Sequence, residues 1–468
     1  MGKETQRGEK HRQLCLSQAR TGEIFDIGII RGKAAMKNFT FWIKEKLWVT
    51  PAIYSLFAVA LSIIFFYVDL YLIETIGEYI PSILLTNVDL AKTIMGSLSG
   101  ALLTMTTFTF STILVVLTMY SSQFSPRTLK NFVHDRLTWR VLGIFLGGFI
   151  YNTLSLLFMR AHLYSHDVIS TFVGIMIAFL CLATFAYFIH HIASTVQVGK
   201  LIIELVGDTE RVVGKFDELE SEGVSPAAGW KPDGIKRTIM TGRVGFIGYI
   251  DFEKMLEFAE KKNMEIELLS CIGEYVHEDK PLVNIYGADS DDFSVDDFFV
   301  FGDERTSEQD IEFAMQKLVE IALRAISPGI NDPNTANDII IRLGNLLGKI
   351  GNLNTGGLVF IDKEGNGRVL YPLPEFEEIL YKVYYQLAYY GRDDISVMSA
   401  ITDSLIVTAE STSAERYEDL WNLQLYVLEA IDPEEMKSLD RKFLQGKLDR
   451  LADQLERSSV NLLMMKEY

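Results

Sequence analysis

Four long apolar segments near the start of this chain limit what it can fold into. They cover about residues 51–73, 95–120, 141–159 and 168–192 of 468. A helix rises about 1.5 Å per residue, so each segment is long enough to cross roughly 30 Å of hydrocarbon. The sequence therefore predicts a four-helix transmembrane domain over residues 48–195, in a multi-pass membrane protein that lies in the lipid bilayer.

Lysine and arginine are concentrated on one side of these predicted spans. They occur before the first span and in the second loop, at Arg31, Lys33, Lys37, Lys44 and Lys46, then Arg127, Lys130, Arg136 and Arg140. The first and third loops carry only Lys92 and Arg160. Basic residues are retained on the cytoplasmic side of a membrane. We therefore expect a basic cytoplasmic segment at residues 1–47, cytoplasmic N- and C-termini, and a location in the cytoplasmic (inner) membrane.

The composition changes near residue 200. Residues 1–200 carry 17 Lys and Arg against 11 Asp and Glu, whereas residues 201–468 carry 27 against 51, a net charge of −24. An acidic surface repels nucleic acid, so we expect no nucleic-acid partner. The cysteines Cys15, Cys181 and Cys271 form no CxxC pair, and His162 and His166 are too few to hold a metal ion. We therefore expect no metal site.

The second span carries a stripe of small and hydroxyl residues at a spacing of three and four. Its members, which would share one helix face, are Ser97, Gly100, Thr104, Thr107, Ser111 and Thr118. Lipid does not solvate such a stripe, so it should lie against another helix or along a wet path. Two readings stay open: close helix packing, or the lining of a pore. In the third span, the GxxxG pair Gly143 and Gly147 favours packing.

A basic segment follows the second span. Ser125 is a good N-cap and Pro126 suits a first helical turn, so a short helix is predicted there. This helix is either an anchor at the membrane interface or a means of transmitting movement to the cytoplasmic domain. The fourth span ends in two histidines, where cations complement the helix C-terminus and the lipid phosphates. The predicted membrane-interface residues are Arg127, Lys130, Arg136, His190 and His191.

The cytoplasmic half is expected to begin with a helix that continues from the fourth span and ends in a linker, together residues 196–234. Short β-type runs with glycines at the turns then predict a small β-rich module at 235–302, with a helix from about Asp251 to Lys262. Its runs at 273–276 and 281–283 look like the half-barrel of lipoyl and biotinyl carrier domains, a barrel-sandwich-hybrid-like fold. No lysine flanked by Met or Asp occupies a hairpin tip, so no attached cofactor is expected.

Residues 303–468 are predicted to be mostly helical. Thr306 and Gln309 fit a capping box that opens a helix from Ser307 to Ile326. The segment SPGINDP forces a turn, after which Asn331, Asp332 and Pro333 start the next helix. A hairpin at LVFID-KEGNG-RVLYP and helices at about 374–391, 394–411, 414–430 and 433–458 follow. The predicted fold class is a membrane α-helical domain plus a cytoplasmic α+β region with a helical C-terminal part.

Catalytic motifs are missing from the sequence, which contains no Walker loop, G-x-S-x-G, H-E-x-x-H or dinucleotide fingerprint. We therefore expect a protein that is not an enzyme and has no cofactor. The strongest polar cluster comprises Asp303, Glu304, Arg305, Arg324, Asn331 and Asp332. Its two readings are a buried ion-pair network that holds the loops around SPGINDP, and a site that senses a ligand or an ion.

Four segments carry a resemblance to a known family. They are SSQFSPRTLKNFVHD, YFIHHIASTVQV, ERTSEQDIEFAMQKLVEIALRAISPGINDPNTA and the YGRDD that begins at residue 390. Together they resemble the bacterial membrane family called domain of unknown function 2254. The resemblance spans about residues 120–395, and the preceding spans fit it as well. It implies a membrane protein with no established activity, in which residues 1–37 look like an extension.

Two hypotheses for the function follow from these features. The first is an oligomeric channel or passive transport protein whose second spans line a shared path for ions, with a cytoplasmic domain for assembly and gating. A single four-helix protomer has little room for a pore, so this hypothesis requires a homo-oligomer. The second is a non-conducting membrane scaffold or sensor whose cytoplasmic domain binds a ligand or a protein. Water-accessible cysteines in the stripe would favour the first, and inert ones the second.

Overall fold

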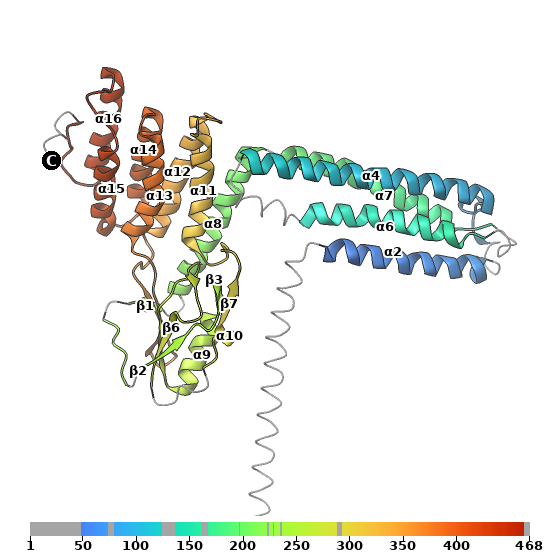
Figure 1. Cartoon of the computed structure of the whole chain (residues 1–468), viewed down its shortest axis with the longest axis horizontal. Coiled ribbons are helices and arrows are strands. Elements are labelled where there is room, and N and C mark those ends of the chain that lie inside the picture. The colour runs from blue at the N-terminus through green and yellow to red at the C-terminus, as the bar shows by residue number, and fades with distance from the viewer. Residues whose placement is uncertain are drawn as a thin grey trace, which may run out of the picture. The chain divides into compact units, whose positions relative to one another are not determined.

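The computed structural model of the chain describes residues 48–73, 79–123, 136–160, 167–195, 197–221, 224–227, 229–234, 236–287 and 293–462. These residues form two compact units (Figure 1). The first contains the four apolar helices. The second contains everything from Ser194 onward, together with the last residues of the second apolar helix. The basic segment 1–47 and the short helix predicted after Ser125 lie outside the described residues.

The four helices of the first unit are long and apolar enough to cross a membrane. They are α2 (Val49–Tyr67), which continues into a π-helical turn η1 (Val68–Leu72), α4 (Val88–Gln123), α6 (Arg136–Phe158) and α7 (Ser170–Thr195). The four predicted spans are therefore confirmed as helices of spanning length. α4 begins earlier than predicted because the Asn87 side chain accepts a hydrogen bond from the Leu90 backbone N–H at 2.9 Å and caps the helix.

Within this unit, α6 is the most deeply buried helix, and its glycines let the neighbours approach. Half of the residues in the most apolar stretch of α6 are buried, against 17% in the corresponding stretches of α2 and α7. Gly143 and Gly147 face α2: a Cβ on Gly147 would lie 3.2 Å from the carbonyl oxygen of Tyr54. A Cβ on Gly148 would lie 3.0 Å from the Sγ of Cys181 on α7. The GxxxG pair therefore lies in a helix contact, as its spacing predicted.

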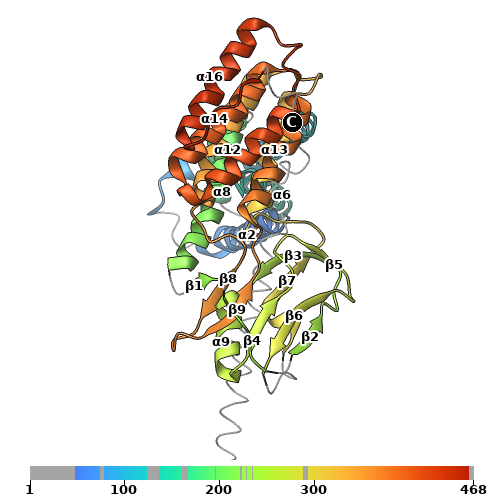
Figure 2. The ribbon, with the colours of Figure 1, turned by 90° about the vertical axis from the view of Figure 1, so that its left-hand side faces the viewer.

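Helices of the second unit pack in two rows (Figure 2). One row consists of α12 (Pro333–Ile350), α14 (Ile395–Ser411) and α16 (Ser438–Gln454), and the other of α11 (Ile311–Ala325), α13 (Phe376–Gly391) and α15 (Tyr417–Glu429). The helix α8 (Val198–Ser221) packs against α11 and α12 and buries Leu205, Val212 and Phe216. The four helices predicted between 374 and 458 are therefore confirmed as α13 to α16.

Two sheets complete the second unit. The larger has the strand order β1-β8-β9-β4-β6-β2, and the smaller has the order β5-β3-β7. Their bounds are β1 (Val224–Pro226), β2 (Lys236–Met240), β3 (Gly245–Ile250), β4 (Glu265–Leu268), β5 (Tyr275–Val276), β6 (Pro281–Tyr286), β7 (Phe299–Gly302), β8 (Leu358–Ile361) and β9 (Gly367–Tyr371). Two helices, α9 (Phe252–Lys262) and α10 (Val295–Phe298), connect strands. β8 and β9 pair antiparallel, which confirms the predicted hairpin.

Strand pairing differs from the predicted β-rich module. β8 and β9 come from residues 358–371, yet they lie between β1 and β4 in the larger sheet. β1 falls in the predicted linker and pairs with β8. Neither sheet closes into a barrel within the described strands, so the likeness to a carrier domain is not confirmed. Partners so distant along the chain leave no local pattern from which their pairing could be predicted.

The predicted capping box of α11 is wrong. The Thr306 hydroxyl donates to the Gly248 carbonyl at 3.4 Å, and the Gln309 amide bonds both backbone groups of Ile250. Asp310 caps the helix instead, because its carboxylate accepts the Phe313 N–H at 2.9 Å. The next helix begins as predicted, with Asp332 as the N-cap of α12.

The expected single helix through the end of the fourth span is also wrong. α7 ends at Thr195, and a second helix, α8, begins at Val198. α8 is amphipathic, and its apolar side is buried in the second unit, so it belongs there rather than to the apolar span.

Candidate functional site

The stripe of α4 lies on the outside of the four-helix unit. All six of its members are exposed: Ser97, Gly100, Thr104, Thr107, Ser111 and Thr118. A different face of α4 packs inside the unit, where Met95, Leu102 and Val116 are buried. The described helices of this unit therefore leave the stripe uncovered.

The threonines of the stripe bond back to their own helix. The hydroxyls of Thr104 and Thr107 each donate to the carbonyl one turn earlier at 3.0 Å, and that of Thr118 does so at 2.8 Å. This bond satisfies each hydroxyl donor without a partner from elsewhere. The oxygen lone pairs can still accept a hydrogen bond or approach a cation. The stripe can thus tolerate a dry contact and can also face water.

A carboxylate is buried at one end of the same unit. Asp69 lies in the π-helical turn η1 and is 2% exposed. It accepts hydrogen bonds from the backbone N–H of Ile169 at 2.8 Å and of Ser170 at 3.3 Å. These amides belong to the start of α7, where partial positive charge favours an anion. Asp69 thus caps α7 from the end of α2. Sequence reasoning missed this role, although an acid within an apolar span is itself a signal.

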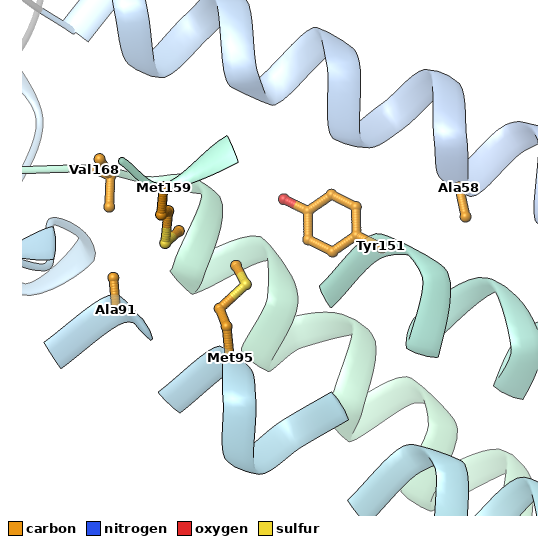
Figure 3. Close-up of a cluster of buried hydrophobic side chains, with 6 residues drawn as sticks. All are labelled: Ala58, Ala91, Met95, Tyr151, Met159 and Val168. Atoms are coloured by element: carbon orange, nitrogen blue, oxygen red, sulfur yellow. The ribbon is translucent and has the colours of Figure 1, made fainter. Parts of the chain in front are cut away.

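Tyr151 contacts the same end of α7 and lies in the apolar cluster that Figure 3 shows. Its hydroxyl donates to the Ser170 carbonyl oxygen at 3.0 Å, and its ring lies in an apolar cluster with Met95, Met159 and Val168. Some buried polar side-chain atoms of the described helices have no hydrogen-bond partner, among them Thr109 Oγ1, Asn152 Oδ1 and Thr171 Oγ1. The interior of the unit is therefore apolar but contains several oxygen acceptors.

The predicted interface residues are only partly described. His190 and His191 lie in the last turns of α7, where His190 is exposed and His191 half-buried. Arg127 and Lys130 lie outside the described residues, as do His162 and His166. Arg136 begins α6, but its side chain is not described. The structure therefore does not test the interfacial helix.

The predicted cytoplasmic cluster is divided between two places. Arg305 precedes α11, whereas the SPGINDP segment follows it, about 20 Å away along a helix of 15 residues. Every side chain of the cluster except that of Arg305 is exposed: Asp303, Glu304, Arg324, Asn331 and Asp332. Asp332 accepts the Thr335 N–H at 3.2 Å, and Asn331 has a left-handed φ of 53°. SPGINDP is thus an exposed helix-capping turn rather than part of a buried ion-pair network.

Arg305 belongs to a half-buried network at the start of α11. Its guanidinium bonds Asp310 and Glu312, and Glu312 also pairs with Lys382 on α13 at 2.6 Å. Burial raises the pKa of Asp310, although Arg305 and the Phe313 N–H favour its ionised form. Because Asp310 also caps α11, the network ties the start of that helix to α13.

The thiol of Cys271 is not an activated nucleophile. Burial, with Glu274 and Glu312 nearby, raises its pKa to about 12, so it stays protonated at neutral pH. Among the residues that the structure describes, no group of three or more His, Cys, Asp and Glu side chains could hold a metal ion. Cys271 is therefore neither a reactive thiolate nor part of a metal-binding group among the described residues.

Comparison with known proteins gives a family. A family model described as "Predicted membrane protein (DUF2254)" matches residues 44–406. The chain is 26% identical over 383 residues to the uncharacterized protein MT1328 of Mycobacterium tuberculosis, covering 78% of this chain and 73% of that protein. It is 25% identical, with the same coverage, to the uncharacterized protein Mb1321c of Mycobacterium bovis. No solved structure matches the chain.

Proposed function

This chain belongs to the DUF2254 family of predicted membrane proteins, and from that premise we propose that it is an oligomeric membrane channel or passive transport protein for small ions. Its second unit serves assembly and gating. The observation that carries the proposal is the outward-facing hydroxyl stripe of α4. We further propose that the protein lies in the cytoplasmic (inner) membrane with both termini inside.

A stripe of this kind is costly to expose fully to lipid, so copies of the chain should gather around it. A single four-helix unit with a packed interior leaves no aqueous path. Copies arranged with α4 toward a common axis would place Thr104, Thr107 and Ser111 along a shared wet path. Their oxygen atoms can then replace part of the hydration shell of an ion.

The first test is the water accessibility of single cysteines in reconstituted protein. Ser97, Thr104 and Ser111 are each replaced by cysteine, and Leu180, which is 56% exposed on α7, is replaced likewise as a lipid-facing control. We expect charged thiosulfonate reagents to modify the three stripe cysteines and to leave the control unmodified. Unreactive cysteines at all three stripe positions would contradict a channel.

Ion flux from proteoliposomes supplies the functional readout. We expect the wild type to release K⁺ or Cl⁻, and Thr107→Leu to lower that flux at least tenfold because it replaces a pore hydroxyl with an apolar group. Thr112→Leu is the matched control, since Thr112 makes the same bond to its own helix at 3.0 Å but lies off the stripe. No flux from the wild type, with no change in Thr107→Leu, would overturn the proposal.

A non-conducting scaffold or sensor is the second candidate. It is favoured by the bonds from Thr104, Thr107 and Thr118 to their own helix. Because these bonds satisfy the hydroxyl donors without water, the stripe can pack against a dry surface at little cost in free energy. In that case the spans anchor the chain, and the second unit binds a ligand or a protein. Inert stripe cysteines would favour this function over the channel.

A further inference from the structure

One side of α16 presents an exposed apolar and basic surface, which we call the basic face. It consists of residues spaced three and four apart: Leu439, Lys442, Phe443, Gly446 and Arg450. Leu439 is 77% exposed and Phe443 58%. An open groove of about 650 Å³ lies beside them. Large exposed apolar side chains that cluster with charges indicate an interaction surface.

Two cations of the basic face have no ion-pair partner among the residues that the structure describes. No ion pair among the described residues involves Lys442 or Arg450. These cations lie in an acidic surrounding, because the chain from residue 201 onward carries 27 bases against 51 acids. Free cations in an acidic surrounding attract an acidic partner.

The row formed by α11, α13 and α15 carries a surface of opposite charge, which we call the acidic face. Tyr381 and Tyr385 of α13 stack with ring centroids 5.1 Å apart, and Tyr426 of α15 meets Tyr381 edge-on at 5.5 Å. Tyr381 is 46% exposed and Tyr426 36%. Tyrosine is enriched where proteins bind one another, since it gives a large rigid contact at low entropic cost.

Acids surround these tyrosines. Glu377 and Glu429 are exposed, and no ion pair within the described part of the chain involves either. Glu418 is exposed too and makes only a distant pair with Arg457, at 3.8 Å. Burial and the neighbouring Glu377 and Glu418 raise the pKa of Asp419, against the effect of Arg416. The acidic face therefore gathers negative charge, and the described residues leave Glu377 and Glu429 without an ion-pair partner.

We propose that the basic face of one copy of this chain binds the acidic face of the next. The inference rests on the proposed function, to which it adds the contact that holds the oligomer together. Each face has an aromatic or apolar centre and free charges at its edge, and the charges are opposite. A second copy is the partner that provides both surfaces at equal concentration.

The positions of the faces determine the kind of assembly. α16 belongs to the row of α12 and α14, and α13 and α15 belong to the other row (Figure 2). Two different surfaces make a heterologous, head-to-tail contact when each copy binds a different neighbour with each of its two faces. Repetition of such a contact forms a ring when the rotation closes, and a ring of copies is the arrangement that a shared membrane path requires.

The test is the mass of the full-length protein in mild detergent, measured by light scattering across a range of concentrations. Lys442→Glu with Arg450→Glu reverses the basic face, and Glu377→Lys with Glu429→Lys reverses the acidic face. We expect each pair to raise the concentration for half-dissociation at least tenfold, and all four changes together to restore assembly. Lys261→Glu with Lys363→Glu, exposed residues near the sheet, is the control that leaves assembly unchanged.

Each outcome decides the proposal. Oligomers that survive both reversals would overturn this contact while leaving the channel hypothesis intact, whereas a wild type that is monomeric throughout would overturn both. Dissociation without restoration by the fourfold variant would show that the faces do not bind one another.

A disulfide assay covers the case in which a reversal variant fails to fold. Phe443→Cys and Tyr426→Cys chains that are co-expressed should form a crosslinked dimer, and neither variant alone should do so. A dimer of Phe443→Cys alone would mean that α16 binds α16, and the absence of the mixed dimer would exclude the contact.

Discussion

The carboxylate of Asp362 holds the turn between β8 and β9. It accepts hydrogen bonds from the backbone N–H of Glu364 at 2.9 Å and of Asn366 at 2.8 Å, and from the guanidinium of Arg368 at 2.6 Å. Burial alone would raise the pKa of Asp362, but these donors outweigh it and hold the pKa well below its usual range. The ionised carboxylate is therefore part of the folded hairpin.

The stability of this hairpin should depend on pH. Since the folded pKa lies below the unfolded value of about 3.9, the stabilisation is present above pH 4 and is lost as the pH falls below it. We expect Asp362→Asn to increase hydrogen exchange in residues 358–371 at pH 7, with wild type and variant converging as the pH falls below about 4. Glu364→Gln, exposed on the same turn, should match wild type. Equal protection of Asp362→Asn at neutral pH would contradict the assignment.

The structural role of a single residue was predictable from the sequence where its hydrogen-bond partners are close along the chain. The Asn331-Asp332-Pro333 pattern predicts the start of α12, and Asp332 caps it by accepting a bond from Thr335 three residues later. Thr306 and Gln309 fitted a local pattern equally well, but both bond β3, more than 50 residues earlier, which leaves Asp310 as the cap. Asp69 likewise bonds residues about a hundred positions away. Side chains with distant partners escape prediction from local spacing.

Asp69 joins two apolar helices, and its removal should weaken that connection. Asp69→Leu leaves the N–H groups of the half-buried Ile169 and the buried Ser170 without this acceptor. Each unsatisfied buried group costs roughly 1–3 kcal/mol. We expect a clear fall in the thermal unfolding temperature of the detergent-solubilised protein, and a smaller fall for Asp69→Asn, which keeps one acceptor oxygen. Asp89→Leu, at a carboxylate whose side chain is 93% exposed on α4, should leave the temperature unchanged. A leucine variant as stable as wild type would contradict the capping role.

The existence of helices was predictable where length or periodicity decides it. The four spans and α13 to α16 follow from long apolar or amphipathic runs. The pairing of strands in the sheets was not predictable from the sequence. β4 pairs in parallel with β9, about a hundred residues later, and neither strand has a sequence pattern that identifies its partner. The hydroxyl stripe of α4 could be found by its spacing, but whether it faces inward or outward depends on how all four helices pack.

At the scale of the whole molecule, an even number of spans places the two ends of the chain on the same side of the membrane. If α2, α4, α6 and α7 all cross the membrane, the residues before α2 and the entire second unit lie on the same side. The basic residues before the first span and in the second loop favour the cytoplasm for that side. The acidic second unit adds no opposing argument, because long domains and acids contribute little to this rule.

Cysteine labelling in intact spheroplasts tests this orientation. In a chain with Cys15 and Cys271 replaced by serine, Ser82→Cys lies in the exposed segment between α2 and α4, and Ser413→Cys lies in the exposed turn between α14 and α15. The third cysteine, Cys181, is buried. We expect a membrane-impermeant maleimide to label Ser82→Cys in intact cells and Ser413→Cys only after lysis. The reverse result would place the second unit outside, where it could not act as a cytoplasmic gate. Labelling of both before lysis would mean that one of the four helices does not cross.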